Sequence, residues 1–226
     1  MHSVDLNGLF VYDLANNHQG DLEHGMNIID ALGDITKRQE VRGALKFQFR
    51  QLDSFIHPDF KEKKDVKHIP RFIETGLSIA QYGELKERVR QNDMLTMSTP
   101  FDEQSVKVIL DLGIDIIKVA SCSASDWPLL EEIAGANRPV IISTAGLALS
   151  KIDRVVSFFG YKNVNFALMH CVALYPTPQE KLNLNQISFL KERFPRIPVG
   201  FSTHEDPSNT NIVRVAYSKG ASILER

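Results

Sequence analysis

Short apolar segments recur along the chain, and they do not alternate with polar residues as half-exposed strands do. Eight of them are rich in Val, Ile, Leu and Phe: Leu9–Leu14, Ala44–Phe49, Met94–Ser98, Asp115–Ala120, Pro139–Ser143, Asn165–His170, Pro198–Phe201 and Ala221–Leu224. Runs of this length are typical of strands that are buried on both faces. The pattern therefore predicts a parallel β-sheet.

Most of the segments between these runs have helical spacing of their apolar residues. The predicted helix faces are Ile73, Leu77, Leu85 and Val89; Val106, Ile109 and Leu110, followed by Gly113 as a C-terminal cap; Ile152, Val155, Val156 and Phe159; and Ile187, Leu190 and Phe194. Alternating strands and helices with right-handed crossovers form either a closed barrel or an open doubly wound sheet.

The number of strands favours the barrel. Eight strand–helix units of about 25–30 residues each fit a (β/α)8 TIM barrel, and Tyr12–Gly20 lacks the glycine-rich fingerprint of open nucleotide-binding sheets. The chain stops at Arg226, directly after the eighth run. We therefore expect one domain over residues 1–226, an α/β TIM barrel without its last helix. The uncovered flank of the first and eighth strands should promote dimerisation or aggregation.

One long polar segment interrupts the alternation after the second run. Residues Gln51–His68 contain Lys61, Lys63, Lys64 and Lys67. A loop in this position follows a strand and therefore lies on the face where barrel enzymes place their sites. A functional lid and a solvated charged loop are equally good interpretations.

The composition of the chain limits the classes of partner and the cellular compartment that can be expected. The net charge is −2 and the isoelectric point is near 6.4, so no global positive field favours nucleic acid. Two cysteines do not form a disulfide framework. The first ten residues lack a secretory pattern, and no apolar run is long enough to cross a membrane. We expect a cytoplasmic protein with neither nucleic acid nor membrane as partner.

Two lysines, Lys46 and Lys118, lie within apolar strands. Lysine is almost never fully buried without a partner, and three arrangements satisfy that need. One is a structural ion pair with Asp13 or Glu225. A second is an oxyanion site in which Thr99, Ser143 and Ser202 add hydroxyl donors beside the two cations. A third is a Schiff-base lysine, as in aldolases, because burial depresses the pKa of an amine.

Three histidines, His18, His170 and His204, lie at or just after strand ends. Because imidazole suits Mn²⁺ or Zn²⁺ in sites of mixed nitrogen and oxygen ligands, His204 is the best candidate metal ligand. The sequence contains no paired-cysteine or HExxH zinc motif, no GxSxG motif and no phosphate-binding Walker loop.

Seven strand-end peptides, taken in order, carry a resemblance to a known family. They are Asn17-His-Gln-Gly20, Lys46-Phe-Gln48, Ser98-Thr-Pro-Phe-Asp102, Lys118-Val-Ala-Ser121, Ile142-Ser-Thr144, Leu168-Met-His-Cys-Val-Ala-Leu-Tyr-Pro-Thr-Pro178 and Gly200-Phe-Ser-Thr-His204. In this set the chain resembles the sialic acid synthase family, from about residue 10 to its end. The peptide from the sixth run is the most specific.

The resemblance implies a (β/α)8 barrel that condenses phosphoenolpyruvate with N-acetylmannosamine or a related amino-sugar aldehyde, using Mn²⁺ or Mg²⁺. The product is a nine-carbon 2-keto acid, and phosphate is released. A homodimer is implied for the full-length form. The resemblance implies that phosphoenolpyruvate is bound by Lys46, Lys118, Ser143 and Ser202. It implies further substrate contacts by Gln48, Thr99 and Ser121, and metal binding by His204. The catalytic residues that it implies are Asp13, His170 and Tyr175.

The sequence departs from the family pattern around the sugar and the metal. Asp13 stands where the family has Glu, and Cys122-Ser123 replaces Gly-Glu, an acid expected to contact the sugar. Thr203 replaces the Asp of Ser-Asp-His, and Ser143-Thr-Ala-Gly146 replaces Ser-Thr-Gly-Met. The second metal-binding histidine is expected just beyond Arg226, and the C-terminal antifreeze-like domain is absent from residues 1–226. A piece of a working synthase, a synthase for another acceptor and a barrel that binds without catalysis all remain open.

Overall fold

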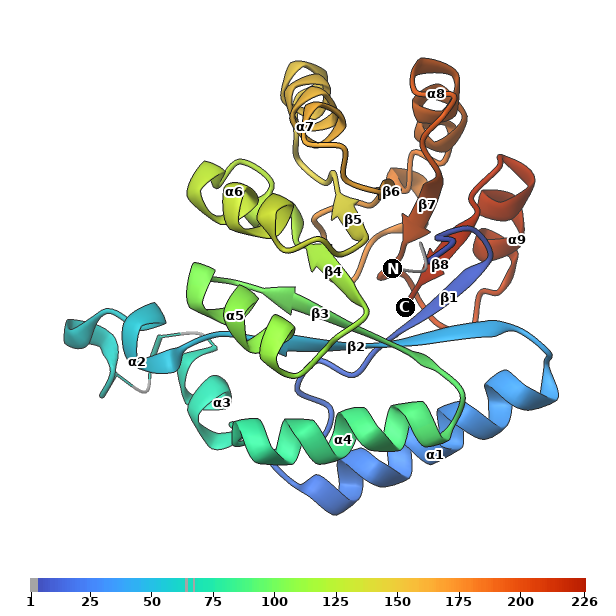
Figure 1. Ribbon diagram of the computed structural model, residues 1–226. Helices are drawn as coiled ribbons and strands as arrows, with labels where there is room; N and C mark the ends of the chain where they lie inside the picture. Colours follow the sequence, from blue (N-terminus) through green and yellow to red (C-terminus); the bar gives the residue numbers. More distant parts are fainter. Residues whose placement is uncertain (1–3, 64, 67) are drawn as a thin grey trace.

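The strands form a closed parallel barrel in the computed structural model, which describes residues 4–63, 65–66 and 68–226 (Figure 1). The strands are β1 (Leu9–Asp13), β2 (Arg42–Phe49), β3 (Leu95–Pro100), β4 (Ile116–Val119), β5 (Val140–Ser143), β6 (Phe166–His170), β7 (Val199–Ser202) and β8 (Ile223–Glu225). Each pairs with the next in sequence, and β1 also pairs with β8. Both the eight strands and the TIM-barrel fold predicted from the apolar runs are confirmed.

Helices between successive strands surround most of the barrel. They are α1 (Leu22–Arg38), α2 (Leu52–Phe55), α3 (Ile69–Glu74), α4 (Ile79–Gln91), α5 (Glu103–Asp111), α6 (Trp127–Gly135), α7 (Leu149–Tyr161), α8 (Asn185–Arg193) and α9 (Asn211–Ser218). Short 3₁₀ turns are η1 (Pro58–Phe60), η2 (Ser121–Ser123) and η3 (Gln179–Lys181). No helix within the described ranges is long and apolar enough to cross a membrane.

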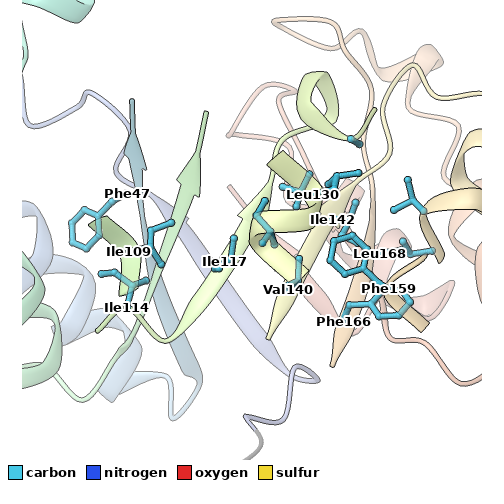
Figure 2. Close-up of a cluster of buried hydrophobic side chains, with 14 of the residues drawn as sticks. Phe47, Ile109, Ile114, Ile117, Leu130, Val140, Ile142, Phe159, Phe166 and Leu168 are labelled. Carbon is cyan, nitrogen blue, oxygen red and sulfur yellow. The ribbon is translucent and has the colours of Figure 1, made fainter. Parts of the chain in front are cut away.

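The apolar runs are continuous because each strand is covered on both faces. Successive strand side chains point to opposite faces, so alternate residues fill two separate cores. Outward-facing strand residues such as Phe47, Ile117 and Leu168 pack against helix residues such as Ile109 and Phe159 (Figure 2). The other set fills the barrel interior and consists of Leu9, Val11, Ala44, Met97, Ile116, Ile141, Ala167, Met169 and Ile223, together with Leu6 from the chain before β1.

The segment after β2 is more ordered than a loop. It contains α2 and η1, so the prediction of a polar loop throughout Gln51–His68 was wrong in this respect. The predicted helix face from Ile73 to Val89 is also divided, because α4 begins at a new cap where Ser78 and Gln81 form a reciprocal capping box. Lys61 and Lys63 lie in this segment, whereas Lys64 and Lys67 are outside the described residues.

The flank formed by β1 and β8 carries an apolar groove. Phe10, Leu32, Phe201, Val213 and Leu224 line it, and its volume is about 380 Å³. Within residues 4–226, as far as they are described, no helix follows β8. The sequence-based expectation of an uncovered apolar flank therefore corresponds to a groove at this position.

Candidate active site

A layer of polar side chains lies on top of the apolar barrel interior, at the carboxyl ends of the strands. It arises from strand periodicity, because a residue two positions after an inward-facing residue also faces inward. Asp13 follows Val11, Lys46 follows Ala44, and Lys118, Ser143 and Glu225 follow Ile116, Ile141 and Ile223 in the same way. Lys46, Lys118, Ser143, Ser202 and Glu225 are each at most 5% exposed. Sequence prediction and structure agree that these side chains lie together.

Lys46 forms two ion pairs in this layer. Its Nζ lies 2.9 Å from Glu225 Oε1 and 3.1 Å from Asp13 Oδ2. Burial by itself disfavours the ammonium, but the two carboxylates outweigh it and raise the pKa of Lys46 above its ordinary value. Lys46 is therefore a permanent cation at neutral pH.

Lys118 has a different environment. Its Nζ donates a hydrogen bond to Ser143 Oγ and lies 3.6 Å from Glu225 Oε1. Burial lowers the pKa of Lys118, Glu225 partly offsets this effect, and the charge of Lys46 adds to the lowering. The two buried lysines therefore differ in chemistry, since Lys118 gives up its proton more readily than Lys46.

Glu225 joins the two lysines through one oxygen. Its Oε1 accepts hydrogen bonds from Lys46 and, at 3.0 Å, from Ser202 Oγ. Burial opposes its charge, yet Lys118 and Lys46 lower the pKa of Glu225 to about 2. Its Oε2 is buried and has no hydrogen-bond partner among the described residues, and the same is true of Asp13 Oδ1. The layer thus contains two carboxylate oxygens that no described residue saturates with a hydrogen bond.

The remaining predicted residues lie around the mouth of the barrel. The rings of Tyr175 and His204 are 4.3 Å apart between centroids, and Tyr175 is largely exposed. Ser121 Oγ accepts a hydrogen bond from the Ala145 N–H at 3.0 Å. Gln48 lies two positions after Lys46, and Thr99, two positions after Met97, is buried. These residues surround the lysine layer from different strands and loops.

His170 does not join this group. It has the outward parity of Leu168, its ring stacks 5.9 Å from Phe201, and its Nε2 lies 2.8 Å from the Leu182 carbonyl oxygen. Burial lowers the pKa of His170, although the hydrogen bond to Leu182 opposes this effect. The structure therefore gives His170 contacts that hold the α8 side of the barrel, and we leave it out of the candidate reaction centre.

The expected metal site has one candidate ligand, His204, among the residues that the structure describes. His204 lies at the mouth, and burial lowers its pKa, which favours the neutral ligand form. Within the described parts of the chain, however, no three His, Cys, Asp or Glu side chains are placed to hold an ion together. The described residues thus do not form a complete metal site.

Sequence reasoning did not assign two residues to the site. Glu225 was considered only as an ion-pair partner, although its spacing from Ile223 places it on the same inward face as the lysines. Arg50 follows Gln48 by two positions and donates from Nη2 to Gln48 Oε1 at 2.7 Å. The same period of two, continued past the end of the strand, would have indicated it.

Buried lysines and hydroxyls therefore lie together at the carboxyl end of a (β/α)8 barrel, the face on which enzymes of this fold place their active sites. The chain belongs to the NeuB family, whose profile matches residues 39–226. This assignment confirms the resemblance inferred from the strand-end peptides.

Relatives and solved structures agree with this assignment. Human N-acetylneuraminate-9-phosphate synthase is 29% identical over 96% of this chain and 60% of its own length. A Chromobacterium violaceum structure titled as a spore coat polysaccharide biosynthesis protein E is 43% identical, with a TM-score of 0.95, covering 97% of this chain and 65% of that one. N-acetylneuraminic acid synthetase from Leptospira borgpetersenii is 28% identical, with a TM-score of 0.85, covering 98% and 73%. The chain spans 58–60% of the length of the first curated relatives that it matches.

Proposed function

We propose that this barrel binds phosphoenolpyruvate and joins it to an N-acylated amino-sugar aldehyde, giving a nine-carbon 2-keto acid and phosphate. The observation that carries the proposal is the pair of buried lysines, Lys46 and Lys118, beside the hydroxyls of Ser143 and Ser202. Phosphoenolpyruvate bears a phosphate and a carboxylate, which match two cations and two hydroxyl donors. Membership of a family that includes sialic acid synthases supports the same chemistry.

The reaction assigns different tasks to the residues of the layer. Carbon 3 of phosphoenolpyruvate attacks the aldehyde carbon, and the aldehyde oxygen takes up a proton from solvent water. Positive charge that develops at carbon 2 is captured by water, and the tetrahedral intermediate then expels phosphate. In this proposal Lys46 and Lys118 bind the anionic groups throughout. Asp13 Oδ1, buried and without a hydrogen-bond partner, accepts the proton that the water loses.

The acceptor binds above this layer, next to Gln48, Ser121 and Tyr175. Thr99 contributes a further substrate contact from the end of β3. His204 remains the proposed ligand of Mn²⁺ or Mg²⁺. Homodimerisation and a cytoplasmic location likewise remain predictions for the whole protein.

Calorimetry with phosphoenolpyruvate, with and without Mn²⁺, tests the proposal on this chain. We expect the wild type to bind and the Lys46→Ala and Lys118→Ala variants not to bind, because each substitution removes a buried cation that faces the anion. Lys162→Ala is the matched control, since it removes an exposed lysine whose partner is Glu131. Absence of binding by folded wild-type chain would overturn the proposal, because the two lysines and two hydroxyls all lie within the described residues.

A Schiff-base aldolase is the second candidate, and the lowered pKa of Lys118 favours it. An imine forms when the neutral amine adds to a substrate carbonyl and water leaves, and borohydride then reduces it to a stable secondary amine. Mass spectrometry after borohydride treatment with pyruvate distinguishes the candidates. We expect no adduct; a stable modification at Lys118 would instead favour the aldolase. Binding of phosphoenolpyruvate without phosphate release, in the full-length protein supplied with acceptor, would indicate a barrel that binds without catalysis.

A further inference from the structure

Glu205 is a buried acid in the loop that follows β7. Its side chain is 2% exposed, and within the described residues neither of its carboxylate oxygens has a hydrogen-bond partner. Burial of a charge is costly unless an opposite charge compensates it. Arg226 supplies the opposite charge, because its Nη1 lies 3.8 Å from Glu205 Oε1 and its Nη2 donates to the Glu205 carbonyl oxygen at 2.9 Å. The guanidinium therefore contacts both the side chain and the backbone of Glu205.

Arg226 is itself held by the barrel. Its N–H donates to the Val11 carbonyl oxygen at 3.0 Å, and its carbonyl oxygen accepts from the Asp13 N–H at 2.9 Å. Both bonds continue the pairing of β8 with β1. Paired strands of a closed sheet open less readily than loops do. Arg226 is therefore the fixed partner of the ion pair, and the loop that carries Glu205 is the part that the ion pair positions.

The loop at residues 204–210, between β7 and α9, is joined by two hydrogen bonds to the loop that follows β6. The Thr177 N–H donates to the His204 carbonyl oxygen at 3.0 Å. The exposed Asn209 donates from Nδ2 to Gln179 Oε1 at 3.2 Å. Both bonds connect one loop to another loop, whereas the contact of Glu205 with Arg226 connects residues 204–210 to the end of a strand.

His204 directly precedes Glu205 and forms part of the barrel mouth. Its ring centroid lies 4.3 Å from that of Tyr175, with an angle of 47° between the ring planes. Tyr175 is 74% exposed, so few neighbours fix the place of its ring. The position of His204 therefore decides where this pair of rings lies above the lysine layer.

We propose that Glu205 is a positioning residue, which anchors the loop after β7 to Arg226 and thereby keeps the ring of His204 against Tyr175 at the mouth. Glu205 acts through His204 and contacts no substrate. The consequence for the acceptor rests on the proposed function, in which Tyr175 lies beside it, whereas the anchoring itself does not. Removal of the Glu205 charge frees the two rings and leaves the lysine layer unchanged.

Proton NMR of the histidine rings tests this anchoring on the chain itself. A neighbouring aromatic ring shifts the resonances of the imidazole C–H protons, so those of His204 report its contact with Tyr175. His170, whose ring stacks 5.9 Å from Phe201, is a control in the same sample. In Glu205→Gln we expect the His204 resonances to move towards those of a free histidine and the His170 resonances to stay. A purely structural role for Glu205 would lower stability and leave both sets unchanged in the folded protein.

A double-variant comparison tests whether Glu205 acts through Arg226. Arg226→Gln should move the His204 resonances as far as Glu205→Gln does, and the double variant should move them no further, because the two residues act as one unit. Asp153→Asn is the matched control, since it breaks the ion pair with Arg193 elsewhere on the molecule and should leave His204 unchanged.

Three results would overturn the proposal. They are His204 resonances at the free position in wild type, His204 resonances that do not move in Glu205→Gln, and shifts that add in the double variant. Should Glu205→Gln not fold, Arg226→Gln replaces it, because the Arg226 side chain is 37% exposed and its loss breaks the same ion pair. Unmoved His204 resonances in that variant would contradict the anchoring equally.

Calorimetry with phosphoenolpyruvate separates this proposal from the proposed function. Lys46 and Lys118 pair with Asp13 and Glu225, not with Glu205. We therefore expect Glu205→Gln and wild type to have dissociation constants within about twofold of each other, as for independent sites. Loss of binding in the folded variant would overturn the proposal, because Glu205 would then act on the lysine layer. If wild type itself fails to bind, the proposed function fails, and the His204 resonances still decide whether Glu205 anchors the loop.

Discussion

At the scale of single residues, Glu225 controls the charge balance of the candidate site. It contacts Lys46, Lys118 and Ser202 with one oxygen, while its other oxygen has no hydrogen-bond partner in the part of the chain that the structure describes. Phosphoenolpyruvate would compete with this carboxylate for the same two cations. Binding therefore involves an exchange of partners around Lys46 and Lys118, and the free energy of the Glu225 contacts opposes it.

Replacing Glu225 with Gln should destabilise the fold in a pH-dependent way. The pKa of this carboxyl is about 2 in the folded chain and 4.5 ordinarily, so the charged form favours folding by about 3 kcal/mol. Because the folded pKa is the lower one, this stability is fully present above about pH 4.5 and is lost as the pH falls towards 2. Urea denaturation at pH 7 and pH 3 measures the difference between variant and wild type, which should be larger at pH 7.

The control for this prediction is Glu84→Gln, an exposed acid on α4. Surface substitutions of this kind change the free energy of unfolding by less than about 0.5 kcal/mol. A Glu225→Gln variant as stable as the control at pH 7 would show that the two lysines do not depend on this carboxylate in the folded chain.

At the scale of elements, α1 and α4 approach closely at Gly33. A Cβ atom there would lie 2.1 Å from Asn92 Oδ1 and 2.7 Å from Asn92 Cβ. Asn92 is also held in place, since its side chain donates to Asp30 Oδ1 and to the Arg88 carbonyl. We expect Gly33→Ala to lower the free energy of unfolding by about 1–3 kcal/mol, the cost of an overpacked contact, as measured by chemical denaturation.

Substitution of a second glycine, Gly160, is expected to raise the free energy of unfolding instead of lowering it. Gly160 lies in α7, and a Cβ atom there would meet no atom within 4 Å. Gly160→Ala should therefore raise stability by up to about 1 kcal/mol through helix propensity alone. If Gly33→Ala also raised stability, the close approach of α1 and α4 would not be a constraint on that position.

The sequence predicted an element correctly where its apolar pattern had a single cause. The strands were predictable because burial on both faces leaves continuous apolar runs, and the inward placement of Lys46 and Lys118 follows from the same periodicity. The helix face proposed from Ile73 to Val89 was wrong because helical spacing does not register the new cap at Ser78. His170 ends a strand, as expected, but its parity directs it outward to Leu182.

The contacts of Arg50 with the rings of Phe72 and Phe101 could not be predicted from the sequence. Phe72 and Phe101 come from different segments, and only the closed barrel brings their ring centroids to 4.2 Å and 4.5 Å from the Arg50 guanidinium carbon. The local sequence around Arg50 contains no signal for either contact.

At the scale of the whole molecule, the groove along β1 and β8 exposes an apolar surface. Phe10, 36% exposed, is one of its lining residues, together with Leu32, Val213 and Leu224. Apolar area that remains in contact with water favours association, with a free energy of about 25 cal/mol per Å² buried. We therefore expect this chain to self-associate as its concentration rises.

Sedimentation velocity over a wide concentration range measures that association. Phe10→Ser should weaken it by removing apolar surface from the groove. Tyr161→Ser is the matched control, because Tyr161 is 85% exposed at the end of α7 and does not line the groove. A chain that stays monomeric and unfolds in one cooperative transition would contradict the expectation, since the groove would then be stable in contact with water. Equal weakening by both substitutions would place the contact elsewhere on the surface.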